Sequence, residues 1–242
     1  MSKIRLQKFL SISGVTSRRK SEDLIRNGLI KLNGKIVTQM GQVVNEGSDI
    51  VEFDGKVIKP KNNLVYYILN KPKGYTSTCC DLHAKHTILE LVPNNPRVFP
   101  VGRLDKDSRG LIILTNDGDL ANKLTHPRYR HDKEYEVKTS IKNPALNSKA
   151  DIIQELNQLT KGVMLDGKIT QSAKIINTSI NIPQKTVDFQ IVLTEGRNRQ
   201  IRRMTDLIGL DVTDLKRIRI GKITLNNIPE GTYRERGLNE LI

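Results

Sequence analysis

The feature that most constrains the fold of this sequence is a series of β-rich segments between residues 64 and 221. Short runs of β-branched, aromatic and aliphatic residues predict strands, and several are joined by links of hairpin length. Helical patterns at 119–127, 147–162 and 197–209 supply helices that flank the sheet. Such strands form a mixed, mainly antiparallel sheet, so we predict an α+β domain rather than a doubly wound one. The strand segments are 64–70, 97–101, 111–115, 134–139, 173–177, 187–193 and 215–221.

A different pattern precedes this series. The segments LQKFLSISG (6–14) and SRRKSEDLIRNG (17–28) each predict a short helix, the second with Ser17 as its N-cap. Asn33-Gly34 and Asp54-Gly55 then lie between β-rich runs, which predicts tight hairpins. The polar segment KPKNN follows as a linker. We therefore predict a small domain at residues 1–60 and a larger one at 61–242.

The charge of the chain indicates its partner. The formal net charge is +14 and the pI is about 9.8, which favours a polyanion, nucleic acid before a membrane surface. No apolar run approaches the roughly 18 residues of a membrane-spanning helix. The adjacent Cys79 and Cys80 exclude a disulfide framework, so a reducing cytoplasm is the expected location.

Basic residues are dense in the small domain, where residues 1–35 hold nine Lys or Arg against two acidic residues. Arg18, Arg19 and Lys20 stand together at the start of the second helix. Cations at a helix start can bind RNA phosphates, whose negative charge the helix N-terminus also favours. The alternative is that they only solvate a helix face.

The stretch GRLDKDSRGLIILTNDGDL (102–120) concentrates acidic residues in this basic chain. It resembles a calcium loop, with Asp105, Asp107 and Gly110 at the first, third and sixth positions. Arg109 and Asn116 then occupy the fifth and twelfth positions, where an oxygen ligand and a bidentate Glu belong. We therefore predict no metal site.

Two other interpretations of this stretch remain. Asp105 and Asp107 could form a pair for acid–base chemistry, while Asp117 and Asp119 are typical of turns and helix caps. Alternatively, Asp105 is a single working acid on a loop between two buried strands. Nearby cations such as Arg103 would favour its ionised form. An ionised carboxylate can act as nucleophile or base without a metal.

Several motifs occur together in a fixed order. GRLDKDSRGLIILTNDGDL resembles the signature of pseudouridine synthases, in particular the RsuA/RluB/RluE/RluF branch. NKPKGY (70–75), KEYEV (133–137), LTEGRNRQIRRM (193–204) and LKRIRIG (215–221) resemble its other motifs. The segment GVTSRRKSEDLIRNGLIKLNGK resembles an S4 RNA-binding domain, which usually accompanies this branch. The resemblance covers nearly the full chain.

The resemblance implies roles for individual residues. Asp105 matches the essential aspartate, which attacks the sugar of the target uridine or abstracts a proton from it. Tyr135 matches the tyrosine that packs on the target base, and Arg202 matches the basic residue that pairs with the aspartate. Leu215 falls where the family has an apolar residue near the base. Arg103 is expected to help fill the helix once the uridine is extruded.

The implied activity is isomerisation of one uridine in ribosomal RNA or in a ribosome assembly intermediate, with 23S rRNA favoured and 16S rRNA possible. The reaction requires no metal and no small-molecule cofactor, and we expect a monomer that does not bind membranes. An alternative is a non-catalytic rRNA-binding assembly factor on the same fold. A hydrolase that releases uracil would use the same aspartate.

Further basic residues of the chain are predicted to contact RNA. Arg197, Arg203, Lys216 and Arg217 are predicted to contact RNA phosphates, which positions RNA without selecting a sequence. Lys71 is expected either to touch the substrate or simply to end a strand.

One further motif invites a zinc interpretation. CCDLHAKH places Cys79, Cys80, His83 and His86 close together, but the spacing matches neither usual zinc pair. We predict that it is a mobile loop facing RNA.

Overall fold

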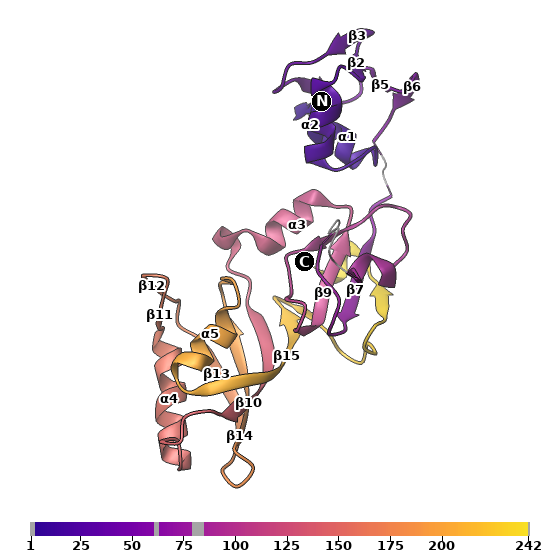
Figure 1. Ribbon diagram of the computed structural model, residues 1–242. Coiled ribbons are helices and arrows are strands. Elements are labelled where there is room, and N and C mark those ends of the chain that lie inside the picture. Colours follow the sequence, from indigo (N-terminus) through magenta and orange to yellow (C-terminus); the bar gives the residue numbers. More distant parts are fainter. Residues whose placement is uncertain (1–2, 61–62, 79–84, 242) are drawn as a thin grey trace. The chain divides into compact units, whose positions relative to one another are not determined.

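The computed structural model describes residues 3–60, 63–78 and 85–241, and contacts divide the chain into two compact units (Figure 1). The N-terminal unit comprises Met1–Val65 with the short segments Asn95–Arg97 and Asn116–Gly118. The larger unit comprises the remaining residues. No helix in the described ranges is long and apolar enough to cross a membrane.

The N-terminal unit has the two expected helices, α1 (Leu6–Ile12) and α2 (Arg18–Arg26), and Ser17 accepts a hydrogen bond from the backbone of Lys20 as N-cap. The strands are β1 (Lys3–Arg5), β2 (Ile30–Leu32), β3 (Lys35–Val37), β4 (Val43–Asn45), β5 (Val51–Phe53) and β6 (Lys56–Ile58).

Two antiparallel sheets form in the N-terminal unit, β1 with β4 and a four-stranded sheet in the order β3-β2-β5-β6. The predicted hairpins connect β2 to β3 and β5 to β6. Asn33 and Asp54 take positive φ of 51° and 50°, and each following glycine does the same, as type I′ turns require. The core of the unit consists of Leu6, Phe9, Leu10, Ile25, Ile30, Val37, Val44 and Val51.

The larger unit is built on one nine-stranded sheet with the path β13-β14-β10-β15-β9-β7-β17. β8 also pairs with β9, and β16 pairs with β15. Among the described strands of this sheet, only β9 and β15 pair in parallel, so the predicted mixed, mainly antiparallel α+β fold is confirmed. The strands are β7 (Tyr66–Lys71), β8 (Phe99–Val101), β9 (Arg109–Thr115), β10 (Lys133–Ile141), β13 (Lys174–Asn181), β14 (Thr186–Leu193), β15 (Leu210–Ile220), β16 (Ile223–Thr224) and β17 (Tyr233–Glu235).

Helices cover this sheet in two places (Figure 1). α3 (Gly118–Thr125) packs Leu120 and Leu124 into a core with residues of β7, β8, β9 and β15. α4 (Lys149–Lys161) lies against β13, and α5 (Gln200–Leu207) lies against β15. Shorter elements are η1 (Ile88–Leu91), η2 (Pro127–Tyr129), η3 (Leu238–Glu240) and the hairpin of β11 (Met164–Leu165) with β12 (Lys168–Ile169).

The parallel pairing of β9 and β15 depends on Gly110. Its register joins Arg109 to Lys216 and Gly110 to Arg217. Gly110 has φ of +102°, and a Cβ there would lie 2.7 Å from the backbone nitrogen of Arg217 and closer still to its carbonyl oxygen. Only glycine allows both this backbone conformation and this approach.

We expect Gly110→Ala to destabilise the larger unit by several kcal/mol, about 3 or more, because backbone must move against backbone. Denaturant unfolding followed by tyrosine fluorescence measures this, since all six tyrosines lie in the larger unit. Gly196→Ala is the control in the same unit: no atom lies within 4 Å of its added Cβ and its φ is not in the left-handed range, and we expect a change within about 1 kcal/mol. Equal stability of the two variants would contradict the prediction.

Candidate active site

A cleft of about 680 Å³ opens in the larger unit, and segments far apart in the sequence form its walls. They are the β8–β9 loop, the end of α3 with the η2 turn, β10, the β14–α5 loop and β15. The excess of positive charge on these walls suits an anionic ligand. The charged lining residues are Arg103, Arg130, Lys133, Arg197, Arg199 and Arg217, against Asp105 and Glu195.

Asp105 lies on the β8–β9 loop, and its side chain is about one third exposed (34%) at the cleft. The loop backbone is fixed on both sides of this residue. Ser77 Oγ donates to the Leu104 carbonyl at 2.8 Å and accepts from the Leu104 N–H at 3.2 Å. The Ser108 N–H donates to the Asp105 carbonyl at 3.1 Å. The carboxylate is therefore presented by a held backbone.

Lys71 is the last residue of β7, which is one of the two alternatives predicted for it, the other being contact with the substrate. Its side chain is fully buried. Its ammonium donates to three backbone carbonyls, at 3.1 Å to Pro72, 3.0 Å to Asp105 and 2.6 Å to Ser108. Burial lowers the pKa of Lys71 to about 8, although the carboxylates of Asp107 and Asp105 oppose this. Lys71 therefore fixes the loop that carries Asp105, and its burial keeps it out of the cleft.

The guanidinium next to the Asp105 carboxylate belongs to Arg199, at 3.8 Å. Arg199 also donates two hydrogen bonds of 3.1 Å to Asp107. Partial burial opposes ionisation of Asp107, but hydrogen bonds from Arg199 and the charge of Arg202 keep its pKa below the usual value. Asp107 thus holds Arg199 beside Asp105 rather than forming an acid–base pair with it.

The expected ion pair between Arg202 and Asp105 is corrected by these contacts. Arg202 donates to the Val212 carbonyl at 3.0 Å and to the Asp107 carbonyl at 3.2 Å, and it forms an ion pair with the Asp107 carboxylate at 3.2 Å. Its position on α5 directs it to β15 and to the backbone of the loop. Arg199 is the N-cap of α5 with φ of 47°, so it leaves the helix and reaches Asp105.

Tyr135 and Leu215, which the family resemblance assigns to the region near the base, both line the cleft. Tyr135 lies on β10 and is paired across the sheet with Arg217, and Leu215 lies two residues before Arg217 on β15. The two side chains are 9% and 6% exposed. Ring and aliphatic side chain thus give the cleft an apolar part beside the carboxylate.

Two residues of β15 that were predicted to contact phosphates form contacts within the protein, and their phosphate contacts remain predictions. Arg217 is buried at 3% exposure because it faces the inside of the cleft wall. Its Nε donates to the Leu111 carbonyl at 2.8 Å and its Nη1 to the Arg103 carbonyl at 3.4 Å. Lys216 does not line the cleft. Strand alternation turns it to the opposite face, where it forms an ion pair with Glu136 at 3.5 Å.

Two further basic residues form intramolecular contacts. Arg197 donates to the carbonyls of Leu165, Lys168 and Ile169, the last at 2.6 Å, and so holds the β11–β12 hairpin. Arg203 forms two hydrogen bonds with Asp166 in the same hairpin. Their phosphate contacts remain predictions, and each would compete with these bonds.

The remaining predicted RNA contacts are on the surface. Arg103 is exposed at the cleft. Arg18, Arg19 and Lys20 are exposed in the first turn of α2 in the N-terminal unit.

No cluster of His, Cys, Asp and Glu suited to a metal ion occurs among the residues that the structure describes. Cys79, Cys80 and His83 lie outside these residues, so the predicted RNA-facing loop is outside them too. His86 is described, and its Nδ1 lies 3.1 Å from a carboxylate oxygen of Glu90.

Sequence reasoning missed the parts played by Arg199, Asp107 and Lys133. It assumed that a helix runs through residues 197–209, whereas α5 begins at Gln200. Lys133 lines the cleft with Tyr135, and the period-two pattern of the KEY motif was the signal that could have placed both on one face.

Arg109, the residue that argued against a calcium loop, contacts Asp214. Its Nη2 and Nε donate to the Asp214 carboxylate at 2.7 and 3.0 Å, and Lys73 lies 2.7 Å from the same group. Burial alone would raise the pKa of Asp214, but the hydrogen bonds from Arg109 and Lys73 lower it to about 2. These contacts join β9, β15 and the residue after Pro72.

We expect Asp214→Asn to lower the free energy of unfolding by about 2 kcal/mol near neutral pH. A carboxyl whose pKa is lower in the folded state stabilises above its unfolded pKa, near 4, and loses this as the pH falls to about 2. The difference between variant and wild type should therefore vanish across that window in denaturant titrations. Asp206→Asn, which removes an exposed pair with Lys142, is the control and should cost less than about 1 kcal/mol. A pH-independent difference would contradict the assignment.

Comparisons with known proteins match both parts of the chain. Residues 65–206 match the RNA pseudouridylate synthase family, and residues 4–50 match the S4 domain. The range that matches the synthase family thus includes the site residues Asp105, Asp107, Tyr135, Arg199 and Arg202.

The similarity to individual relatives extends over most of this chain and over most of each relative. Ribosomal large subunit pseudouridine synthase B of Bacillus subtilis is 40% identical over 96% of this chain and 91% of its own. The dual-specificity RNA pseudouridine synthase RluF of Escherichia coli is 40% identical over 100% of this chain and 78% of its own. A crystal structure of a pseudouridylate synthase is 27% identical, covers 98% of each chain and superposes with a TM-score of 0.64.

Proposed function

Because the chain belongs to the RNA pseudouridylate synthase family, we propose that it converts one uridine of ribosomal RNA into pseudouridine and that Asp105 acts on the sugar of this nucleotide. The chain is an isomerase. The reaction breaks the bond between N1 of uracil and C1′ of ribose and rejoins the base through C5. One observation carries the assignment of the site: Asp105 enters a cleft beside Tyr135 and Leu215 and faces Arg199.

Asp105 has the environment that this role needs. Lys71 and Ser77 hold the loop backbone, so the carboxylate keeps its position when a nucleotide enters. The guanidinium of Arg199 lies 3.8 Å from the carboxylate, and a carboxylate is the group that attacks C1′ or removes the C2′ proton. Arg202 supports the same loop through Asp107.

Tyr135 and Leu215 form the surface against which the uracil lies. An aromatic ring stacks on a base at a gain of about 1–3 kcal/mol, and stacking tolerates rotation of the base in its own plane. This matters because the detached uracil must turn before C5 meets C1′. The ring therefore retains the base without fixing its orientation.

The target nucleotide must first leave its helix, at a cost of a few kcal/mol. Arg103, exposed at the cleft, is placed to fill the gap, and the exposed cations of α2 bind phosphates elsewhere in the RNA. We favour 23S rRNA as the substrate because the Bacillus subtilis relative is named for the large subunit, with 16S rRNA as the second candidate. Binding should weaken steeply with salt, since it rests on phosphates.

We further propose that the protein acts as a monomer in the cytoplasm on rRNA or a ribosome assembly intermediate. The isomerisation leaves the composition and the oxidation state of the nucleotide unchanged, so it calls for neither metal nor redox cofactor.

The test maps pseudouridines in the host's 16S and 23S rRNA with the gene intact, deleted and restored, and repeats the reaction with purified protein on transcripts of the site found. Loss of a single pseudouridine on deletion and its return on restoration are the expected results. Pseudouridine must also form in the transcript without release of free uracil.

Other outcomes point to the competing functions. If every pseudouridine survives deletion and the purified protein modifies no rRNA transcript, the assembly-factor function replaces this proposal. If free uracil accumulates instead of pseudouridine, the enzyme is a hydrolase that uses the same aspartate.

A further inference from the structure

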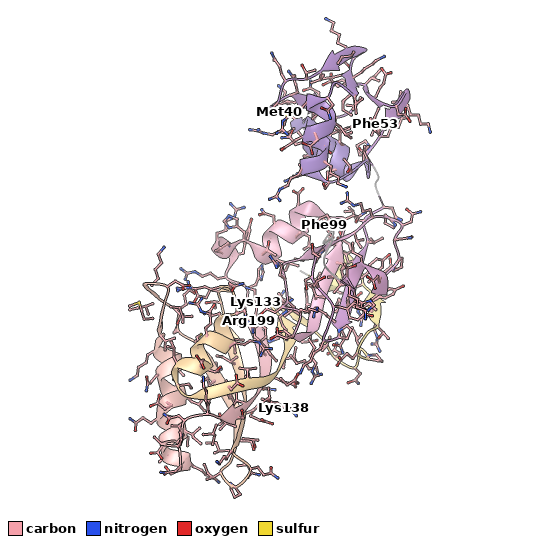
Figure 2. All side chains as sticks on the ribbon, viewed as in Figure 1. Met40, Phe53, Phe99, Lys133, Lys138 and Arg199 are labelled. Carbon is pink, nitrogen blue, oxygen red and sulfur yellow. The ribbon has the colours of Figure 1, made fainter. Side chains whose placement is uncertain are left out.

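Two cations that line the cleft beside Tyr135 have no role in the reaction proposed above. Lys133 lies two residues before Tyr135 on β10, and Arg217 is paired with Tyr135 across the sheet on β15. All three line the cleft, and Figure 2 shows Lys133 and Arg199 in the region between α3 and α5. A register shift at Ile218 of β15 leaves the alternation of β10 intact, so Lys133 and Tyr135 share a face.

Neither cation is neutralised within the described part of the chain. Arg217 donates only to the backbone carbonyls of Leu111 and Arg103, and its Nη2 is buried without a hydrogen-bond partner. Lys133 forms no ion pair among the described residues, and burial and the charge of Arg217 both lower its pKa, against an opposing effect of Asp132. Two uncompensated, partly buried cations near each other cost free energy unless an anion joins them.

The two carboxylates of the cleft are engaged elsewhere. Asp105 faces Arg199, and Glu195 is bound by Arg197 at 3.3 Å and by Gln200 at 2.7 Å. The positive charges of Lys133 and Arg217 thus remain without a carboxylate partner at the part of the cleft that Tyr135 lines. An anion in this place must come from the substrate.

The reaction itself produces such an anion. When the N1–C1′ bond breaks, its electron pair stays on N1, so the detached base is a uracil anion delocalised over its ring and carbonyl oxygens. If Asp105 forms an ester with C1′, or if it takes the proton from C2′, the carboxylate becomes neutral in either case. One negative charge therefore moves from Asp105 to the base. It disappears when C5 bonds to C1′, the carboxylate is regenerated, and the C5 proton is lost while N1 is protonated.

We propose that Lys133 and Arg217 stabilise the detached uracil anion beside Tyr135. The cleft then has cations both where the negative charge starts, at Asp105, and where it arrives, at the base. Arg199 lies beside the negative charge of Asp105 before bond cleavage, and Lys133 with Arg217 lies beside the negative charge of the base afterwards. Fixed charges in a half-buried site act most strongly on charge that develops during the reaction. The inference rests on the proposed function, because a protein that makes no pseudouridine forms no such anion.

The experiment compares Lys133→Met with Lys138→Met under single-turnover conditions on a transcript containing the target uridine. Lys138 lies on the same strand but is exposed and does not line the cleft (Figure 2), so it matches the change of charge and length. We expect Lys133→Met to lower the rate by about 10²-fold or more and Lys138→Met to leave it within about threefold. RNA affinity and the unfolding midpoint should change equally in both variants. Lys133→Arg, which restores the charge, should recover part of the rate.

A second substrate shows whether Lys133 stabilises the uracil anion or only positions the target nucleotide. Fluorine at C5 withdraws electrons and makes uracil a better leaving group, so an RNA with 5-fluorouridine at the target needs less help from Lys133. The loss caused by Lys133→Met, followed as disappearance of intact 5-fluorouridine, should shrink by about tenfold, that is by about 1.4 kcal/mol of barrier.

The outcomes are distinct. An unchanged rate, a loss confined to RNA affinity as a phosphate contact would give, or an equal loss with both bases would overturn the inference. Wild-type protein that forms no pseudouridine on any rRNA transcript refutes the proposed function instead.

Discussion

Asp105→Asn is expected to abolish pseudouridine formation, with the single-turnover rate lower by at least about 10³-fold. Asparagine keeps the shape of the side chain and can accept hydrogen bonds, but it neither attacks C1′ effectively nor takes a proton. The backbone bonds of Lys71 and Ser77 to this loop do not involve the replaced atoms, so folding should be retained. Nucleoside analysis of the reacted transcript measures the product.

RNA affinity distinguishes this loss from a loss of binding. The variant removes one negative charge from a cleft that binds a polyanion, so its affinity should equal or slightly exceed that of wild type. Asp107→Asn provides a graded comparison. It weakens the contacts that hold Arg199 and Arg202 but leaves the acid in place, and we expect a loss on the order of tenfold. Normal turnover by Asp105→Asn would exclude the proposed role.

The elements of the fold could be predicted because each has a local cause. Ser17 caps α2 through its own side chain, and Asn33-Gly34 forms a hairpin because both residues take positive φ. The resemblance to the family's motifs, not a local cause, marked Tyr135 and Leu215, and both residues line the cleft. The β11–β12 hairpin carries the same signal, with Asp166 and Gly167 at positive φ, and could have been predicted in the same way.

The contacts of charged residues could not be predicted, because they depend on which strands meet. β9 and β15 are parallel neighbours over two residue pairs only, and this pairing buries Arg217 and brings Asp214 to Arg109. A motif match placed Arg202 opposite Asp105, whereas the αL backbone of Arg199 at the start of α5 gives that position to Arg199. Sequence spacing contains no information on either arrangement.

Lys71→Met is expected to lower both the stability and the activity of the protein, although Lys71 lies outside the cleft. The methionine fills the same buried space but leaves the carbonyls of Pro72, Asp105 and Ser108 without their donor. We expect the free energy of unfolding of the larger unit to fall by about 2–4 kcal/mol, because unsatisfied buried carbonyls cost more than the desolvation of the ammonium that is relieved. Denaturant unfolding followed by tyrosine fluorescence measures this change.

Lys73→Met is the matched control, since it lies in the same KPK segment but is half-exposed and pairs with Asp214 at the surface. Its expected cost is below about 1 kcal/mol, with normal turnover. Lys71→Met should also turn over at least about tenfold more slowly at temperatures where it remains folded, because the loop that presents Asp105 has lost its anchor. If folded Lys71→Met keeps wild-type turnover, the carboxylate is positioned by Ser77 and the arginines alone, and the buried ammonium serves stability only.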